Sequence, residues 1–298
     1  EPVLVVCING EDEIVGLILS VIQREYKGFF GKLSSRSIIW GAPLIKEDNI
    51  EVFKILLNEY DKIVKRKAVY TQIRNLWNTE IFKKEFENYG YIYEDHLNIL
   101  VDLTKNVDEL WKEVYSRRRS QINKSERLGV SIKIFNEPDI VDKSYEILLD
   151  VYKRAKLPLA GKEFFTAAYK FLGEKEYLKF FGAFFEGKLV GVMYLLCYNQ
   201  KTYEWYIGSF FDYMRMHPND LIIWEIFNWS KKNAYTIFDF GGAGSPDKEY
   251  GVREYKKKFG GETINLGRYQ KIHNRFLMFI SVIGFRFWQF LKSGFNKS

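Results

Sequence analysis

Two neighbouring segments late in the chain carry the residue types best suited to chemistry on an anionic or polarised group. Residues 239–244 read DFGGAG, residues 255–261 read YKKKFGG, and Arg253 precedes the second segment. Glycines let the backbone approach a ligand closely, and lysines attract phosphate or a developing negative charge. The alternative interpretation of the lysine run is a solvated basic helix end, because charge runs usually face water.

The glycine-rich segment does not fit the common nucleotide-binding motifs. Residues 242–247 lack the third glycine of G-x-G-x-x-G, and the chain contains no G-x-x-x-x-G-K-[ST]. The segment is therefore interpreted either as a close backbone approach to a ligand or as a tight turn that packs two strands. The three histidines, His96, His217 and His273, are scattered without metal-ligand spacing, so no metal site is predicted.

Composition limits the class of protein. With 298 residues, the chain is long enough for about two domains. Hydrophobic residues are 47% and charged residues 28%, which excludes disorder, collagen-like repeats and a coiled coil. Cys7 and Cys197 lie in apolar runs and are predicted to be buried, reduced thiols, which favours the cytoplasm. The chain opens EPVL, and no signal peptide is predicted.

The net charge of +7 is concentrated at one end. Residues 253–298 hold ten Lys or Arg and two Asp or Glu, a net of +8, so the other 252 residues net −1. This asymmetry predicts a local anionic partner: phosphate, nucleic acid or membrane. The apolar run 276–291 contains Arg286 and is shorter than the roughly 20 residues of a membrane span. A basic, aromatic helix over 271–292 is predicted, either in the membrane interface or packed across the domains.

Hydrophobic periodicity predicts alternating strands and helices. In the first half, the strands are 3–8, 14–22, 32–41, 68–74, one within 92–102, and 130–135, and the helices are 49–64 and 107–128. In the second half, the helices are 140–155, 162–172, 219–233, 249–258 and 271–292, and the strands are 177–185, 189–198, 202–208, 235–240 and 263–267.

The two halves look like copies of one unit. Each contains two strands joined by a turn, a third strand ending near a glycine, a helix of about four turns and a fourth strand. Matching elements start 167 to 175 residues apart. The second copy has two helices before its first strand and the first copy has none, which predicts that helices precede residue 1.

The element order is that of the GNAT acyltransferase fold, and residues 203–269 resemble the C-terminal part of the FemABX family. The string DFGG followed by YKKKFGG carries most of this resemblance, and residues 107–134 resemble the family's middle helix and strand. The resemblance implies an α+β fold with mixed sheets and two tandem GNAT-like domains. These are predicted over 1–136 and 137–270, with the C-terminal amphipathic helix in 271–298.

The family resemblance implies an acyltransferase that moves an activated acyl or aminoacyl group onto an amine of a cell-envelope precursor. Tyr255-Lys256 matches the family's Phe-Lys pair, whose lysine is associated with the transfer step, so Lys256 is the first catalytic candidate. Asp239 is the candidate general base, or a group that orients the backbone. The predicted substrate-binding residues are Tyr255, Arg253, Lys257, Lys258, Trp205, Tyr206, Tyr250, Gly241 and Gly242. For the three aromatic residues outside the YKKKFGG segment, core packing is the alternative to an acceptor groove.

The donor is expected to be a co-substrate, either aminoacyl-tRNA or acyl-CoA, with no tightly bound cofactor. Segments 42–49 and 209–220 lack the glycine-rich pyrophosphate loop usual in CoA-dependent GNAT enzymes, which favours tRNA. The helical hairpin of many tRNA-using relatives is also absent, which weakens that assignment. The alternatives are a CoA-dependent N-acyltransferase acting on a sugar-linked or small amine and a non-catalytic membrane-surface module. The expected location is the cytoplasm, with peripheral contact to the inner face of the membrane through 271–292.

Overall fold

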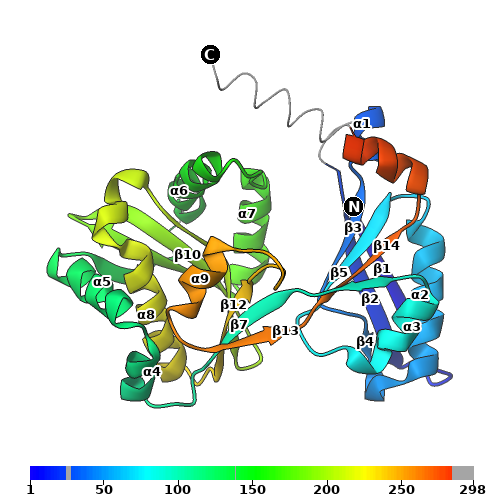
Figure 1. The fold of residues 1–298 in the computed structure, drawn as a ribbon, viewed down its shortest axis with the longest axis horizontal. Helices are drawn as coiled ribbons and strands as arrows, with labels where there is room; N and C mark the ends of the chain where they lie inside the picture. Colours follow the sequence, from blue (N-terminus) through cyan, green and yellow to red (C-terminus); the bar gives the residue numbers. More distant parts are fainter. Residues whose placement is uncertain (25–27, 138, 284–298) are drawn as a thin grey trace. The chain divides into compact units, whose positions relative to one another are not determined.

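The computed structural model describes residues 1–24, 28–137 and 139–283 (Figure 1). The chain divides into two compact units. Unit 1 comprises Glu1–His96 and the chain from Asn265 onward, and unit 2 comprises Leu97–Ile264. Each unit is built on a seven-stranded sheet with both parallel and antiparallel pairs. The predicted mixed α and β class is therefore confirmed.

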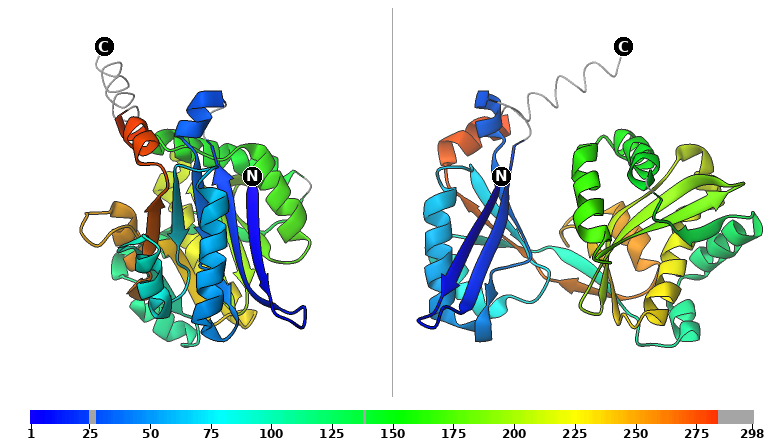
Figure 2. Two further views of the ribbon diagram at one scale, coloured as in Figure 1. Left: turned by 90° about the vertical axis from the view of Figure 1, so that its right-hand side faces the viewer. Right: turned by 180° about the vertical axis from the view of Figure 1, so that it is seen from behind.

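Unit 1 contains an antiparallel strand pair, a third strand, a crossover helix and further strands. Its elements are β1 (Pro2–Ile8), β2 (Ile14–Gln23), α1 (Gly28–Leu33), β3 (Arg36–Trp40), β4 (Leu44–Ile45), η1 (Lys46–Asp48), α2 (Ile50–Val64), β5 (Tyr70–Arg74), η2 (Glu80–Phe82), α3 (Lys83–Asn88), β6 (Ile92–Glu94) and β14 (Arg268–Ile272), followed by helical residues 275–283. The sheet order is β1-β2-β3-β5-β14-β6, with β4 paired to β2. Helix α2 begins where the Asn49 side chain accepts from two backbone N–H groups, and its apolar side packs on the sheet (Figure 2).

Unit 2 repeats this plan with additional helices. Its elements are β7 (Leu97–Asp102), α4 (Val107–Glu113), α5 (Ser116–Arg127), β8 (Ser131–Ile134), α6 (Ile140–Ala155), α7 (Lys162–Ala168), η3 (Tyr169–Gly173), β9 (Leu178–Phe185), β10 (Lys188–Tyr198), β11 (Lys201–Ser209), η4 (Phe211–Met216), α8 (Pro218–Lys232), β12 (Ile237–Gly242), α9 (Gly251–Lys257) and β13 (Glu262–Asn265). The sheet order is β13-β7-β12-β11-β10-β9-β8.

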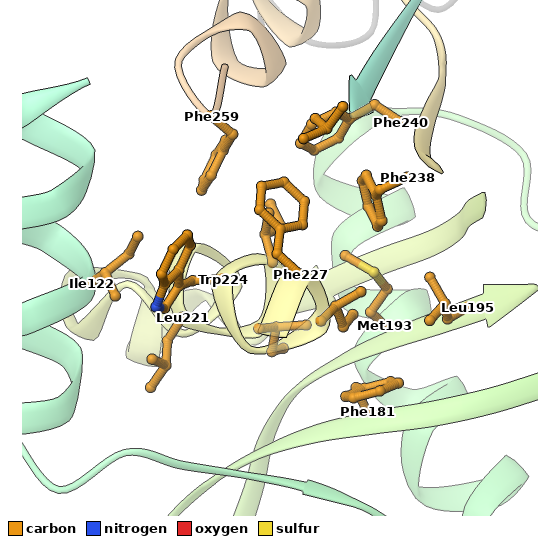
Figure 3. Packing of buried hydrophobic residues seen from close by; sticks show 14 of the residues in the cluster. Ile122, Phe181, Met193, Leu195, Leu221, Trp224, Phe227, Phe238, Phe240 and Phe259 are labelled. Atoms are coloured by element: carbon orange, nitrogen blue, oxygen red, sulfur yellow. The ribbon is translucent and has the colours of Figure 1, made fainter. Parts of the chain in front are cut away.

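Aromatic packing holds the helices of unit 2 on their sheet (Figure 3). Phe227 of α8 lies 5.0 Å, centroid to centroid, from Phe238 of β12, and Phe238 lies 4.7 Å from Phe240. Phe259, just after α9, lies 5.9 Å from Phe240. Since all four rings are buried, removing one would lose both transfer free energy and packing. This cluster fixes the end of α9, where the YKKKFGG segment begins, against the end of β12.

The predicted internal repeat is confirmed by strand order and direction. In unit 1, β1 and β2 are antiparallel, β2 and β3 are antiparallel, and β3 and β5 are parallel through the crossover helix α2. In unit 2, β9, β10, β11 and β12 have the same three relations, with α8 as the crossover helix. The layers that cover the sheets differ. Helices α6 and α7 contribute to a core on the face opposite α8, whereas Leu4, Ile8, Ile14 and Leu19 of unit 1 are each more than half exposed.

The division into units differs from the predicted boundary at 136/137. Residues 92–102, predicted to hold one strand, form β6 in the unit 1 sheet and β7 in the unit 2 sheet. Likewise β13 pairs with β7, and β14 returns to pair with β5 and β6. The chain therefore passes between units at 96/97 and 264/265, because β7 and β8 belong to the unit 2 sheet and β14 belongs to the unit 1 sheet.

Three local predictions also need correction. The helix predicted over 107–128 is two helices, since Val114 and Tyr115 have extended backbone and the Arg119 guanidinium donates to the carbonyl groups that end α4. The predicted strand 32–41 begins later, because Leu33 ends α1. In the helix predicted over 271–292, Lys271 and Ile272 belong to β14, residues 275–283 are helical, and 284–292 lie outside the described residues. Within the described ranges, every helix is too short or too polar to cross a membrane.

The assignment of β14 to unit 1 is testable. Tyr269 is fully buried and stacks on Phe86 at 4.0 Å. We expect Tyr269→Ala to destabilise unit 1 by about 3–5 kcal/mol, and Tyr269→Phe, which keeps the ring, to cost less than about 1.5 kcal/mol. Amide hydrogen exchange read strand by strand is the measurement. Protection should fall in β1, β2, β3 and β5. A loss confined to β9, β10 and β11 would contradict the assignment.

Candidate active site

Strands β11 and β12 separate in the middle of the unit 2 sheet. Their parallel register contains three pairs, from Lys201 and Ile237 to Tyr203 and Asp239, although β11 continues to Ser209. In unit 1, the equivalent strands β3 and β5 stay paired over all five residues of each strand. Since backbone N–H and C=O groups are obligatory hydrogen-bonding groups, the part of β11 beyond Tyr203 offers an edge to an extended ligand. We call this place the β11/β12 divergence.

A β-bulge lies directly beside the divergence. Tyr206 pairs with Tyr194 and Glu204 pairs with Leu195, so Trp205 is an extra residue in β11. A bulge can turn two successive side chains to one face. Trp205 and Tyr206 accordingly both lie near Phe165, at 6.2 and 5.0 Å between ring centroids. Both predicted groove residues are half-buried and pack on a buried aromatic cluster, as the core-packing alternative predicts, and a contact of either with substrate remains a prediction.

Lys256 extends from α9 to the divergence. Its side chain is buried, with 8% of the residue exposed. The ammonium group donates to the carbonyl oxygens of Phe240 and, at 3.4 Å, Gly242, and it lies 3.1 Å from Oε1 of Glu204. An ammonium has three N–H donors, and these three acceptors use all of them. Lys256 therefore ties α9 to both of the separating strands.

Glu204 is a site residue that the sequence analysis missed. It is buried in β11, and burial raises the pKa of its carboxyl group while the Lys256 ammonium opposes that shift. A buried carboxylate normally needs a charged or hydrogen-bonded partner. The available signal was a charged residue inside the aromatic strand YEWYIGS, but its partner lies 52 positions later and cannot be found by local spacing.

Asp239 lies at the last position of β12 that pairs with β11. It is 1% exposed, and its Oδ1 accepts from the backbone N–H of Gly241 at 2.7 Å and from the Asn98 amide at 3.3 Å. Burial raises the pKa of its carboxyl group, against the Gly241 hydrogen bond. This geometry matches the backbone-orienting role, and the general-base role remains a prediction.

The three glycines that follow Asp239, at positions 241, 242 and 244, have different structural environments. Gly241 has a φ of +69°, and a side chain there would place Cβ 2.7 Å from Oη of Tyr203. Gly242 presents its carbonyl oxygen to Lys256. Gly244 has a φ of +76° and lies against the ring of Tyr250, whose own residue is exposed. A direct contact of Gly241 or Gly242 with substrate remains a prediction.

Arg253 does not have a guanidinium group free for phosphate, contrary to the sequence-based expectation. Its side chain is buried and donates to the carbonyl oxygens of Ala243, Ser245 and Lys248. It therefore holds the loop between β12 and α9. Lys257 is exposed, with Nζ 4.0 Å from Glu254, and Lys258 is half-buried. A phosphate contact of Lys257 or Lys258 remains a prediction.

Tyr255 belongs to a buried polar cluster at the first turn of α8. Its hydroxyl donates to Oδ1 of Asp220 at 2.7 Å, and burial raises its pKa well above the ordinary value. The Arg118 guanidinium donates to the same carboxylate at 3.1 Å and lies 4.3 Å from the Tyr255 ring centroid. Asp220 and Arg118 are 102 positions apart, so this pair was not visible in sequence. The Tyr255 hydroxyl is therefore used in a hydrogen bond to Asp220 inside unit 2.

The ion pair between Lys256 and Glu204 generates a pH-dependent prediction. The Glu204 pKa is higher in the folded chain than in the unfolded chain. At a pH between these folded and unfolded pKa values, Glu204 is therefore protonated in the folded chain and ionised in the unfolded chain. Wild-type stability should therefore increase, relative to Glu204→Gln, as the pH falls through the raised pKa. Below the ordinary glutamate pKa, the difference should become constant. Urea unfolding of both proteins across acidic and neutral pH measures this difference, and a trend of the opposite sign would contradict the burial argument.

Comparisons with known proteins agree with this architecture. Residues 113–257 match a family model described as an acetyltransferase (GNAT) domain, a range that contains the divergence and all but the last lysine of the lysine run. No curated protein matches the sequence.

Solved structures extend the likeness to nearly the whole chain. A crystal structure of FemX matches with a TM-score of 0.71 and 14% identity, covering 94% of this chain and 90% of that one. The C-terminal domain of a putative lysylphosphatidylglycerol synthetase from Agrobacterium fabrum matches with a TM-score of 0.62 and 15% identity, covering 94% and 86%. A tandem GNAT protein from the clavulanic acid biosynthesis pathway matches with a TM-score of 0.60 and 10% identity, covering 92% and 84%. The chain thus has a GNAT-like fold, and its GNAT domain match indicates a transferase.

Proposed function

We propose that this protein is an acyltransferase that moves an activated acyl or aminoacyl group onto an amine of a cell-envelope precursor, at the β11/β12 divergence of unit 2. The observation that carries the proposal is the divergence itself, with the bulge at Trp205 beside it. A strand edge without a neighbouring strand offers hydrogen bonds to an extended acyl donor along its length.

Unit 2 is the better candidate for chemistry because its repeat alone combines three features within the described residues. It has the divergent strands, the buried lysine at their point of separation, and the GNAT family match. The equivalent strands of unit 1 are fully paired and leave no comparable edge. Unit 1 is therefore proposed to contribute to acceptor binding or to stability.

The proposed reaction needs no covalent enzyme intermediate. The neutral amine attacks the carbonyl carbon of the donor, and a C–N bond forms as the C–O bond of an ester or the C–S bond of a thioester breaks. The amine loses a proton and the departing oxygen or sulfur gains one. The protein has to align the two substrates and stabilise the negative charge that develops on the carbonyl oxygen.

Lys256 is proposed as a positioning residue in this step. Its three N–H donors already contact Phe240, Gly242 and Glu204, so it acts through its charge and through the strand ends that it holds. A positive charge in a buried setting interacts more strongly than one in water. The negative charge on the carbonyl oxygen develops only in the transition state. An interaction that stabilises it therefore lowers the activation barrier and raises kcat.

Two observations bear on the donor. A pyrophosphate commonly binds at a helix N-terminus, but in α8 the buried carboxylate of Asp220 already occupies the first turn and pairs with Arg118. This favours a donor other than CoA, such as aminoacyl-tRNA. The second candidate, a CoA-dependent N-acyltransferase, is favoured by the description of the matching family as acetyltransferases. A cytoplasmic location and a lipid-linked acceptor are part of the proposal, because the resemblance to the FemABX family implies them.

A donor screen tests the function. Purified protein is incubated with a panel of amine acceptors and with acetyl-CoA, longer acyl-CoAs or charged tRNA, and donor consumption is followed directly. Amine-dependent consumption of charged tRNA supports an aminoacyltransferase. Amine-dependent consumption of acyl-CoA supports a CoA-dependent N-acyltransferase. Consumption of neither donor with any acceptor would contradict the catalytic proposal.

The lysines of α9 give a prediction for catalysis. Lys256→Met should reduce kcat by about 100-fold, because the strand ends that Lys256 holds would shift and a misplacement of about 1 Å can cost that much, with a smaller effect on KM. Because the change leaves Glu204 buried without its cation, the double variant Lys256→Met with Glu204→Leu serves as the folding control. It should recover stability without recovering turnover. Near-normal turnover in Lys256→Met, with loss of turnover in Asp239→Asn, would transfer the leading role to Asp239.

Lys257 is the matched comparison on the same helix, because it is exposed where Lys256 is buried. We expect Lys257→Met to weaken donor binding and to reduce its salt dependence by about one phosphate contact, while kcat stays close to wild type. Donor titrations at several salt concentrations measure this. An unchanged salt slope would exclude Lys257 from the phosphate contacts.

A further inference from the structure

The helical segment that follows β14 carries an exposed apolar stripe. Residues 275–283 are helical, and Phe276, Phe279 and Ile283 are 71%, 64% and 50% exposed. Their spacing of three and four positions places them on one side of the helix. Single exposed apolar residues are ordinary, but a contiguous aromatic stripe usually marks an interaction surface.

The opposite side of this helix is attached to unit 1. Oγ of Ser281 donates to the carbonyl oxygen of Leu33 at the end of α1. At the start of the helix, the backbone N–H groups of His273 and Asn274 donate to the carbonyl oxygen of Val69. Figures 1 and 2 show the orange-red helix lying beside α1. The stripe is therefore held outward by specific contacts on the other side of the helix.

Basic residues lie near the start of the helix. Val69, which accepts from His273 and Asn274, comes two positions after the basic segment Lys65-Arg66-Lys67, and Arg275 is the first helical residue. Lys67 pairs with Glu1, whereas the described part of the chain records no ion pair for Lys65, Arg66 or Arg275, all of which are exposed. Glu59 and Asp61, which precede the basic segment in α2, pair with Lys62 and Lys271.

We propose that this surface, defined by Phe276, Phe279, Ile283, Arg275, Lys65 and Arg66, binds the surface of an anionic lipid bilayer. Aromatic side chains enter the boundary between headgroups and acyl chains, while neighbouring cations attract anionic headgroups. A protein partner would need a complementary acidic surface. A bilayer instead accepts a narrow stripe such as the one on the helical residues 275–283, because its interface adapts to the side chains. The proposal does not depend on the proposed transferase activity.

Vesicle co-sedimentation with the full chain tests the proposal. Vesicles of phosphatidylcholine alone are compared with vesicles that also contain phosphatidylglycerol, at low and high salt. Wild type should bind the anionic vesicles, bind phosphatidylcholine weakly and lose affinity in high salt. Failure to bind the anionic vesicles, or equal binding to both compositions, would overturn the proposal.

Paired variants locate the binding surface. Phe276→Glu with Phe279→Glu should lower the partition coefficient by about tenfold or more, and each of Lys65→Gln and Arg66→Gln should lower it by about fivefold. Phe171→Glu is the matched control, since Phe171 is also 64% exposed but belongs to unit 2. Circular dichroism and thermal unfolding establish that each variant folds.

Three outcomes would contradict the assignment of the stripe to lipid binding. If the double glutamate variant sediments like wild type, the stripe is not the lipid contact. If wild type forms a dimer by light scattering, and the double variant becomes monomeric with unchanged vesicle binding, the stripe is an interface between copies. Equal loss of vesicle binding in Phe171→Glu would show a general effect of added negative charge, and would also overturn the assignment.

Discussion

The contact on which the unit 2 site depends is the buried ammonium group of Lys256 between two separating strands. Beyond Tyr203 and Asp239, β11 and β12 no longer pair, and the carbonyl groups of Phe240 and Gly242 need other donors. Lys256 supplies them, and Glu204 balances its charge from the opposite strand. An unpaired buried polar group costs more than a typical hydrogen bond contributes. The divergence can therefore persist only because this lysine replaces the missing ladder contacts.

Much of the architecture was predictable because its signals are local. Apolar runs bounded by turns such as Asn9-Gly10 and Glu186-Gly187 predicted β1, β2, β9 and β10 within one or two residues, and the repeat followed from their order. The strands β6, β7 and β14 were predicted poorly, because each is short and pairs with strands far away in sequence. The unit boundaries depend on those pairings, so they were predicted poorly as well.

The site shows the same limit. The motif around Lys256 was visible in sequence because it resembles the FemABX family's string, but the partners that define its environment were not. Glu204 and Phe240 lie 52 and 16 positions earlier. Arg253 illustrates the reverse case: its charge predicted a ligand contact, whereas burial commits its guanidinium to backbone carbonyl groups. Sequence reports charge, but only packing decides whether that charge is available.

The two repeats show how one topology supports different roles. Both have the same strand directions and crossover helix, so their backbone plan does not distinguish them. The difference lies in a bulge and a buried ion pair, which together open one sheet and leave the other closed. A closed parallel pair satisfies its own backbone and offers no edge to a ligand, whereas an open pair requires internal support that only some sequences supply. Duplication of the fold therefore does not duplicate the site: unit 1, without a lysine and glutamate in the equivalent strands β3 and β5, keeps those two strands paired over their whole length.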